Sequence, residues 1–246
     1  MPVFFVRPDC IAPPTISITG DLLIHLRNSL RVTTGETLWF SNGQGTRYHA
    51  EITEVSKQAV SGHILETIQE PPHRTPRLTL GQSLLKGEKM DWVIQKTTEL
   101  GVDEVVPIES RHSIVQLKAD RVEHQLARWQ RIALEAAQQS EQWRVPTIAL
   151  PQSLAALLSS RGNDTMTLML AERKERWSLQ TVELPRDAIV SMLVLIGPEG
   201  GWSKEEWLIA EQSQVEQITL GPHILRAETA AIATISILQS RLSALE

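Results

Sequence analysis

Cysteine and long apolar runs are both scarce in this sequence. Cys10 is the only cysteine among 246 residues, so no disulfide can form within the chain. No Cys/His spacing typical of a zinc site occurs, and we expect no metal cofactor. The apolar run Met192–Ile196 has the length of a buried strand and is far too short to span a membrane. The opening MPVFFVRPDC lacks a basic leader followed by an apolar core, so we expect a cytoplasmic protein without a membrane partner.

An excess of positive charge is also absent. The chain has 24 lysines and arginines against 29 aspartates and glutamates, which gives a formal net charge of −5. Such a protein has no global field that attracts nucleic acid, so any nucleic-acid site has to be a local basic patch. The composition is otherwise that of a globular protein, with 41% apolar and 22% charged residues. The length allows one large domain or two modest ones with a substantial core.

The first part of the chain has the pattern of a β-rich domain. A strand-like run, ETLWFS, leads into the turn signal NGQG, and RYHAEITEV follows with alternating character. The three prolines of QEPPHRTPRL then disfavour both helix and sheet pairing. We therefore place a domain boundary between residues 70 and 77, and expect one domain over residues 1–72 and another over residues 77–246.

From residue 77 onward, strand-like and helical patterns alternate, which is typical of an α/β domain with a mostly parallel sheet. The predicted strands are RLTLGQSLL, VDEVVPI, TMTLML, SMLVLI and QITL. KMDWVIQKTTELG is predicted as an amphipathic helix that ends at Gly101. DRVEHQLARWQRIALEAAQQS is predicted as a longer helix, in which Asp120 and Glu123 have the spacing of a capping box. We expect Trp92 and Trp129, one on each helix, to lie in the core.

A bare loop, LIGPEGGWSKEE, follows the strand SMLVLI and leads at once into a helix. Ser203 and Glu206 have capping-box spacing, and Trp202 and Trp207 fit a hydrophobic staple. Ligands of open α/β sheets sit in such loops at the carboxyl ends of strands. The loop nevertheless lacks the lysine and serine or threonine of a phosphate loop, and its spacing is not the dinucleotide fingerprint. Taken alone, it is compatible with a ligand loop or with a tight turn.

A second stretch, ITLGPHILRAETAAIATISILQ, repeats this logic. A strand ends at Leu220, Gly221 and Pro222 turn the chain, and an alanine-rich helix begins near Glu228. The alanines favour ordinary tight helix packing, although they also let a flat ligand come close. Arg226 precedes the helix at a place where a plain core has no use for a guanidinium. It could hold a phosphate or a developing anion, or form a surface ion pair with Glu228.

LIGPEGGWSKEE and LGPHILRAETAAIATISILQ together resemble the SPOUT class of knotted RNA methyltransferases, and within it the bacterial 16S rRNA uracil-N3 methyltransferase family. KGEKMDWVIQKTTELGVDEVVPIESRHSIV, RWQRIALEAAQQS and HLRNSLRVTTGETLWFSNGQG extend the similarity over nearly the whole chain. The resemblance implies an α/β fold with an N-terminal PUA-like β-barrel and a C-terminal SPOUT domain that contains a trefoil knot. Chain-order rules argue against knots, so the residues alone predict none.

The resemblance also implies a cofactor, a substrate and an assembly. S-adenosyl-L-methionine is expected to bind where the glycine loops meet, with the glycines leaving room for it. The implied cofactor-binding residues are Leu170, Ala171, Glu172, Ile196, Gly197, Gly200, Leu220, Gly221, Ile224 and Leu225. The implied substrate is 16S rRNA of the small ribosomal subunit. We expect its phosphates to contact Arg7, Arg31, Lys86 and Lys89.

The same resemblance implies a homodimer. The last helix carries Ile232, Ile235, Leu238 and Leu242, more apolar surface than one subunit is expected to cover.

The chain departs from the family pattern in three places. Gln142 and His223 stand where basic residues are common, and Asn42 stands where aspartate is usual in the turn.

For the chemistry we assign Arg226 and Glu228. Loss of the uracil N3 proton leaves an anion, and a fixed cation such as Arg226 stabilises it best in a dry site. Glu228 either orients Arg226 or takes the proton, or it is simply an acid favoured by a helix N-terminus. The alternative functions are another SPOUT methyltransferase, acting on ribose 2′-O or another base, and a non-catalytic rRNA-binding assembly factor. A nucleotide hydrolase is disfavoured by the missing phosphate-loop lysine.

Overall fold

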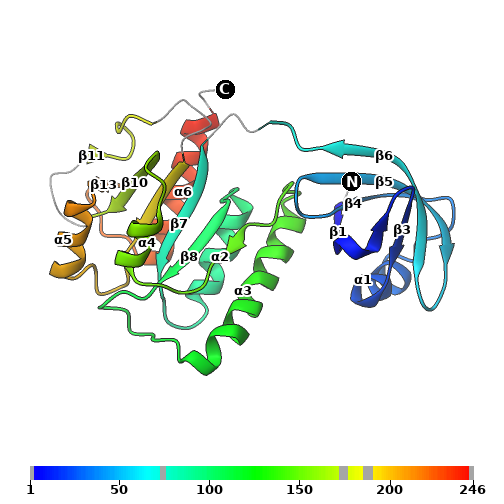
Figure 1. Cartoon of the computed structure of the whole chain (residues 1–246), viewed down its shortest axis with the longest axis horizontal. Coiled ribbons are helices and arrows are strands. Elements are labelled where there is room, and N and C mark those ends of the chain that lie inside the picture. The colour runs from blue at the N-terminus through cyan, green and yellow to red at the C-terminus, as the bar shows by residue number, and fades with distance from the viewer. Residues whose placement is uncertain (1–2, 73–75, 172–176, 185–190, 244–246) are drawn as a thin grey trace. The chain divides into compact units, whose positions relative to one another are not determined.

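The computed structural model describes residues 3–72, 76–171, 177–184 and 191–243. The chain forms two compact units, Met1–Pro72 with Ala137–Val145, and His73–Ala136 with Pro146–Glu246. Residues 137–145 thus return to the first unit, which the sequence did not predict. In Figure 1, residues 3–72 of the β-rich first unit are blue to cyan and its residues 137–145 are green.

The first unit contains a six-stranded sheet in the order β1-β4-β5-β6-β3-β2. Neighbouring strands are antiparallel except for the parallel pair β1 and β4. The strands are β1 (Val3–Phe5), β2 (Ile11–Ala12), β3 (Thr15–Ile18), β4 (Thr37–Ser41), β5 (Thr46–Val55) and β6 (Val60–Gln69). The short helices are η1 (Pro8–Cys10), α1 (Gly20–Ile24) and η2 (His25–Ser29).

Alternating side chains build the core of the first unit. Ile16 and Ile18 of β3 are buried while Thr15 and Ser17 between them are exposed, as expected of a strand with one solvated face. The cluster also includes Phe4, Leu23, Leu26, Phe40, Ile52 and Val60.

The turn between β4 and β5 depends on Asn42. Its Oδ1 accepts hydrogen bonds from the backbone amides of Gln44 (2.8 Å) and Thr46 (3.1 Å). Gly43 follows with a φ of +67°, which a glycine adopts without strain. Asparagine therefore does here what aspartate does in this kind of turn, because one side-chain oxygen is enough.

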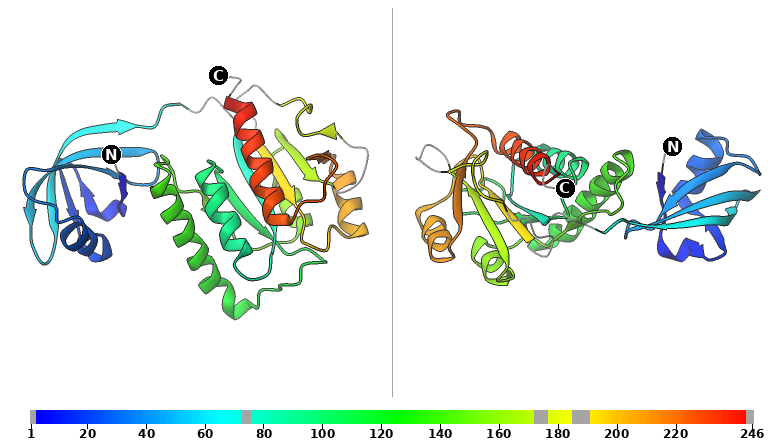
Figure 2. Two further views of the ribbon diagram at one scale, coloured as in Figure 1. Left: turned by 180° about the vertical axis from the view of Figure 1, so that it is seen from behind. Right: turned by 90° about the horizontal axis from the view of Figure 1, so that it is seen from above.

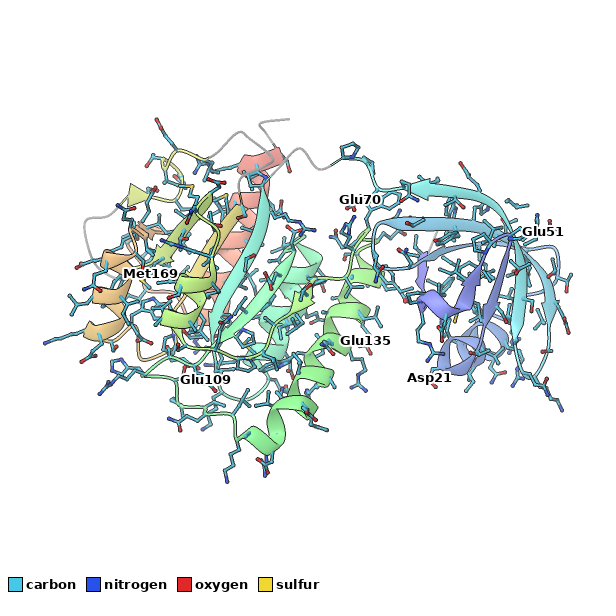
Figure 3. The ribbon with its side chains drawn as sticks, in the orientation of Figure 1. Asp21, Glu51, Glu70, Glu109, Glu135 and Met169 are labelled. Carbon is cyan, nitrogen blue, oxygen red and sulfur yellow. The ribbon has the colours of Figure 1, made fainter. Side chains whose placement is uncertain are left out.

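Residues 137–145 are fastened to this hairpin by side chains and backbone. Arg47 Nη2 donates to the backbone carbonyls of Glu141 (2.5 Å) and Gln142 (3.3 Å), and the guanidinium lies 3.9 Å from the ring centroid of Trp143. Burial lowers the pKa of Arg47, although the charges of Glu141 and Glu70 oppose the shift. Arg144 forms an ion pair with Glu70, which Figure 3 labels. The backbone of Gln142, where the resembled family has arginine, thus takes part in holding the unit together.

The second unit contains a seven-stranded sheet in the order β11-β13-β10-β12-β7-β8-β9, and every pair is parallel. The predicted parallel α/β sheet is confirmed. The strands are β7 (Arg77–Ser83), β8 (Glu104–Ile108), β9 (Thr147–Ile148), β10 (Thr165–Leu170), β11 (Trp177–Ser178), β12 (Ser191–Ile196) and β13 (Glu216–Thr219). The helices are α2 (Lys89–Glu99), α3 (Ala119–Gln139), α4 (Leu154–Ser160), α5 (Lys204–Gln212) and α6 (Ala227–Ser243).

The helices cover both faces of this sheet. Helices α2 and α6 pack together on one face, and α4 and α5 pack together on the other, as Figure 2 shows from above. Gly81 of β7 faces α4, since a Cβ there would lie 3.1 Å from Leu157 and 2.7 Å from Leu195. A larger side chain at this position would push the helix off the sheet.

Three sequence-based expectations about these helices are wrong. Trp92 is 54% exposed on α2, whereas Trp129 is buried, as expected, and donates its indole N–H to Asp91. Helix α3 begins at Ala119, so Asp120 lies within its first turn and does not cap it. In α6, the side chains of Ile235, Leu238 and Leu242 are buried within the chain itself and Ile232 is half-buried, so this helix offers a second subunit less apolar surface than expected.

Candidate functional site

A pocket of about 770 Å³ opens at the carboxyl edge of the parallel sheet of the second unit. Residues 170–171 after β10, 196–202 after β12 and 219–227 after β13 line it. These strands are neighbours in the sheet, with β10 between β12 and β13, so their loops meet at one edge. In Figure 3, Met169 marks β10 just before its loop. All of the expected cofactor-binding residues line this pocket except Glu172, which lies outside the described residues.

The loop after β12 is held by the start of α5. Ser203 Oγ accepts from the Glu206 amide (3.2 Å), and Glu206 Oε2 accepts from the Ser203 amide (2.8 Å), which confirms the predicted capping box. Trp202 and Trp207 pack in the same core cluster, as a hydrophobic staple requires. The helix start therefore fixes the end of the glycine loop.

The glycines of this loop are needed for the chain's own packing, in addition to the room for a cofactor that the sequence indicated. A Cβ on Gly197 would lie 3.1 Å from Trp202 Nε1, and one on Gly200 would lie 3.0 Å from His112 Cβ. Gly201 and Gly221 have φ values of +70° and +127°, which other residues rarely adopt. These positions need glycine because the loops pack against the chain's own side chains and turn sharply. This requirement does not depend on a ligand.

The segment after β8 supports the glycine loop from outside. His112 forms a 3.2 Å hydrogen bond between its Nδ1 and the Gly201 carbonyl. The amide of Arg111 donates to Glu206 Oε1 (3.1 Å), on the same carboxylate that caps α5. Sequence reasoning missed His112 as a site residue. The available signal was its position just after the predicted strand VDEVVPI, at the edge where ligands of such sheets bind.

Arg226 occupies the N-cap position of α6. Its carbonyl accepts a 2.8 Å hydrogen bond from the Ala230 amide, while its side chain is exposed and lines the pocket. A cation is disfavoured at a helix N-terminus, so the helix gains nothing from it there. Among the described residues, no ion pair joins Arg226 to Glu228. The surface ion pair that the sequence left open is therefore not formed.

Glu228 pairs with a different cation. Its side chain is 10% exposed, and its Oε2 lies 3.9 Å from Lys89 Nζ at the start of α2. Lys89 Nζ also donates to Glu199 Oε1 in the glycine loop at 2.8 Å. That hydrogen bond raises the pKa of Lys89. Burial raises the pKa of Glu199, but hydrogen bonds from Lys89 and from backbone amides lower it further than burial raises it.

Lys89 therefore stands beside the pocket with a partly exposed side chain, and its contact with RNA stays a prediction. The other three predicted RNA contacts are exposed. Arg7, which pairs with Asp9 at 3.3 Å, and Arg31 belong to the first unit, and Lys86 belongs to the second. Their contact with RNA stays a prediction. His223 is exposed and lines the pocket.

No group of three or more His, Cys, Asp or Glu side chains in the described ranges is arranged to hold a metal ion. None of their helices combines the length and the apolar character that crossing a membrane requires.

Comparison with known proteins gives this architecture a family. Residues 72–239 match the model of an RNA methyltransferase domain, and residues 18–65 match an RNA methyltransferase PUA domain. The chain is 31% identical to Ribosomal RNA small subunit methyltransferase E of Bacillus subtilis over 91% of this chain and 89% of the relative. The relative of the same name from Synechocystis is 28% identical over 95% of this chain and 76% of its own length.

A solved structure matches nearly the whole chain. It is a Ribosomal RNA small subunit methyltransferase E from Neisseria gonorrhoeae bound to S-adenosyl methionine, with a TM-score of 0.86, 30% identity and 98% of both chains covered. The fold and pocket thus define an RNA methyltransferase with a PUA domain. Within that class, the chain belongs to the family of ribosomal RNA small subunit methyltransferase E.

Proposed function

We propose that this protein transfers a methyl group from S-adenosyl-L-methionine to N3 of one uridine in 16S rRNA of the small ribosomal subunit, uridine 1498 by the family's name. The family membership supports the rRNA methyltransferase activity. The observation that carries the chemical assignment is the exposed, unpaired guanidinium of Arg226 at the lining of the pocket, as judged among the described residues.

The pocket suits the cofactor in size and in lining. Its volume of about 770 Å³ lies within the range of small-molecule sites. Leu170, Ile196 and Leu220 offer apolar surface, and Gly197 and Gly221 also line the pocket. Bound S-adenosylmethionine supplies an electrophilic methyl group on a sulfonium. The residues that would hold it are the loop residues after β10, β12 and β13.

In this reaction the protein's side chains stabilise the negative charge that develops on the uracil. N3 loses a proton and gains the methyl group, and the negative charge that forms in between spreads onto O2 and O4. The planar guanidinium of Arg226 can donate to two oxygens at once, which suits that anion. Glu228 is too deeply buried to take the proton by direct contact, so we assign the transfer to a water that Glu228 orients.

The assembly and the setting are part of the proposal. A homodimer is supported by the resemblance and by the exposed Trp92 on α2, and no longer by α6. Light scattering that gives a monomer mass at micromolar concentration would contradict it. The trefoil knot is proposed for the loops after β10, β12 and β13, which meet at the pocket. We propose a cytoplasmic location, which a small-subunit substrate supports.

Mass mapping of rRNA nucleosides tests this function. We expect 3-methyluridine at one site of 16S rRNA to disappear when the gene is deleted, to return with the wild-type gene, and to stay absent with Arg226→Ala. Loss of a 2′-O-methyl group or of another methylated base instead would identify a different SPOUT methyltransferase. An unchanged nucleoside map together with defective small subunits would identify an assembly factor.

A further inference from the structure

Four charged side chains gather where α2, the glycine loop and α6 begin or meet. Lys89 is the first residue of α2, Glu199 lies in the loop after β12, and Arg226 and Glu228 flank the start of α6. Two cations and two carboxylates in one place allow more than one pairing. The structure contains only one of these: Lys89 contacts both carboxylates, at 2.8 Å from Glu199 Oε1 and 3.9 Å from Glu228 Oε2.

Arg226 belongs to the same group of charges as these carboxylates. Its charge acts on Lys89, where it opposes the rise in the lysine's pKa. Arg226 lies two residues before Glu228 and lines the same pocket as Glu199. A guanidinium forms a two-pronged hydrogen-bonded pair with a carboxylate more readily than an ammonium does. An arginine held in such a pair could not turn toward an anion in the pocket.

Glu228 increases the need for a separate cation. Its Oε2 is buried and has no hydrogen-bond partner among the described residues. A buried carboxylate oxygen without a hydrogen bond attracts any nearby cation strongly, because little water screens it. Within the described structure, the lysine at 3.9 Å is the cation that the ion-pair geometry assigns to it.

We infer that Lys89 is a positioning residue that keeps Arg226 free: it binds Glu199 and compensates Glu228, so that the guanidinium remains available to an anion in the pocket. The claim that Lys89 keeps the Arg226 guanidinium unpaired concerns only the side chains of this protein and does not depend on the reaction. Only the identity of the anion, the ionised uracil, rests on the proposed function. Lys89 thus acts on the reaction through Arg226 and is not itself expected to touch the uracil.

Chemical labelling of arginine tests this inference without any methyl transfer. Phenylglyoxal modifies free guanidinium groups, and peptide mass mapping measures its rate at Arg226 against the exposed Arg121 of α3 as an internal reference. We expect Lys89→Met to slow labelling of Arg226 about two- to fivefold, because Arg226 would then pair with a carboxylate and an exposed ion pair has an equilibrium constant of about that size. Lys89→Met with Glu199→Gln should restore much of the rate, and Lys89→Arg should retain it. An unchanged rate at Arg226 in Lys89→Met overturns the inference.

Single-turnover methyl transfer to small-subunit particles supplies the second measurement. Lys89→Met should lower the rate at saturating RNA while cofactor affinity stays near that of wild type, and added Glu199→Gln should restore part of the rate. Lys204→Met, at an exposed position that starts α5, is the matched control and should behave as wild type. If Lys89→Met weakens RNA binding alone, Lys89 is a phosphate contact and the inference is wrong. A wild-type protein that transfers no methyl refutes the proposed function, while the labelling result still decides the role of Lys89.

Discussion

Gly200→Ala should weaken cofactor binding, and the reason lies in the protein's own packing. The added methyl group would stand 3.0 Å from His112 Cβ and 3.3 Å from the His112 carbonyl oxygen. Neither atom belongs to a flexible side-chain end, so one of the two loops has to move. Inserting a methyl group into such a tight place costs about 1–3 kcal/mol. If the glycine loop takes up that movement, affinity for S-adenosylmethionine falls about 5- to 140-fold, since 1.4 kcal/mol is tenfold.

A double variant separates this explanation from the one that the sequence indicated. His112→Gly removes the Cβ that the alanine meets, so Gly200→Ala with His112→Gly should bind the cofactor more tightly than Gly200→Ala alone. Titration calorimetry with S-adenosylmethionine measures all three proteins, with His112→Gly alone as the reference for the lost hydrogen bond to Gly201. If His112→Gly restores nothing while circular dichroism shows intact folding, the methyl group meets the cofactor itself and our reasoning is refuted.

Three further predictions concern the same edge of the sheet. Arg226→Ala should leave cofactor binding near wild type and lower single-turnover transfer by about two to three orders of magnitude, the effect of losing one oxyanion donor; a loss confined to RNA affinity would make it a phosphate anchor. Ser203→Ala should reduce the free energy of unfolding by about 1 kcal/mol, measured in urea, because the Glu206 amide loses its cap. The contact between Lys89 and Glu199 should be present above about pH 4.5, the ordinary pKa of glutamate, and lost as the pH falls through the lowered pKa of Glu199. Thermal unfolding across the acidic range checks this, and Glu199→Gln should remove that acid-dependent step.

Much of the second unit could be predicted from local sequence patterns, because helix caps, helix ends and buried strands depend on interactions within a few residues. The capping box at Ser203 and the helix end at Gly101, which has a φ of +84°, depend on hydrogen bonds and dihedral angles within one turn. The strand run SMLVLI became β12 in the middle of the sheet, where apolar residues are buried on both faces. Such features need no knowledge of the rest of the chain.

Burial of a particular helix face was less predictable because it depends on what lies opposite. Trp92 and Trp129 both follow an apolar pattern, yet Trp92 is exposed and Trp129 is covered and bonded to Asp91. The apolar residues of α6 looked like a dimer face, but α2 and the sheet bury Ile235, Leu238 and Leu242. Periodicity gives the orientation of a side chain on its helix and not the identity of its neighbour.

The contact between Lys89 and Glu199 could not be predicted from the sequence because it depends on the order of the strands in the sheet. Strand β12 follows β7 by more than a hundred residues, yet the two are paired in register, with Ile196 beside Gln82. Because both strands run in the same direction, the segment that leads into α2 and the glycine loop leave the sheet at the same edge. A lysine in KGEKMDW and a glutamate in GPEGG then become partners. The pairing of these two charges, and with it the freedom of Arg226, is therefore a consequence of strand order, which no short stretch of the chain encodes by itself.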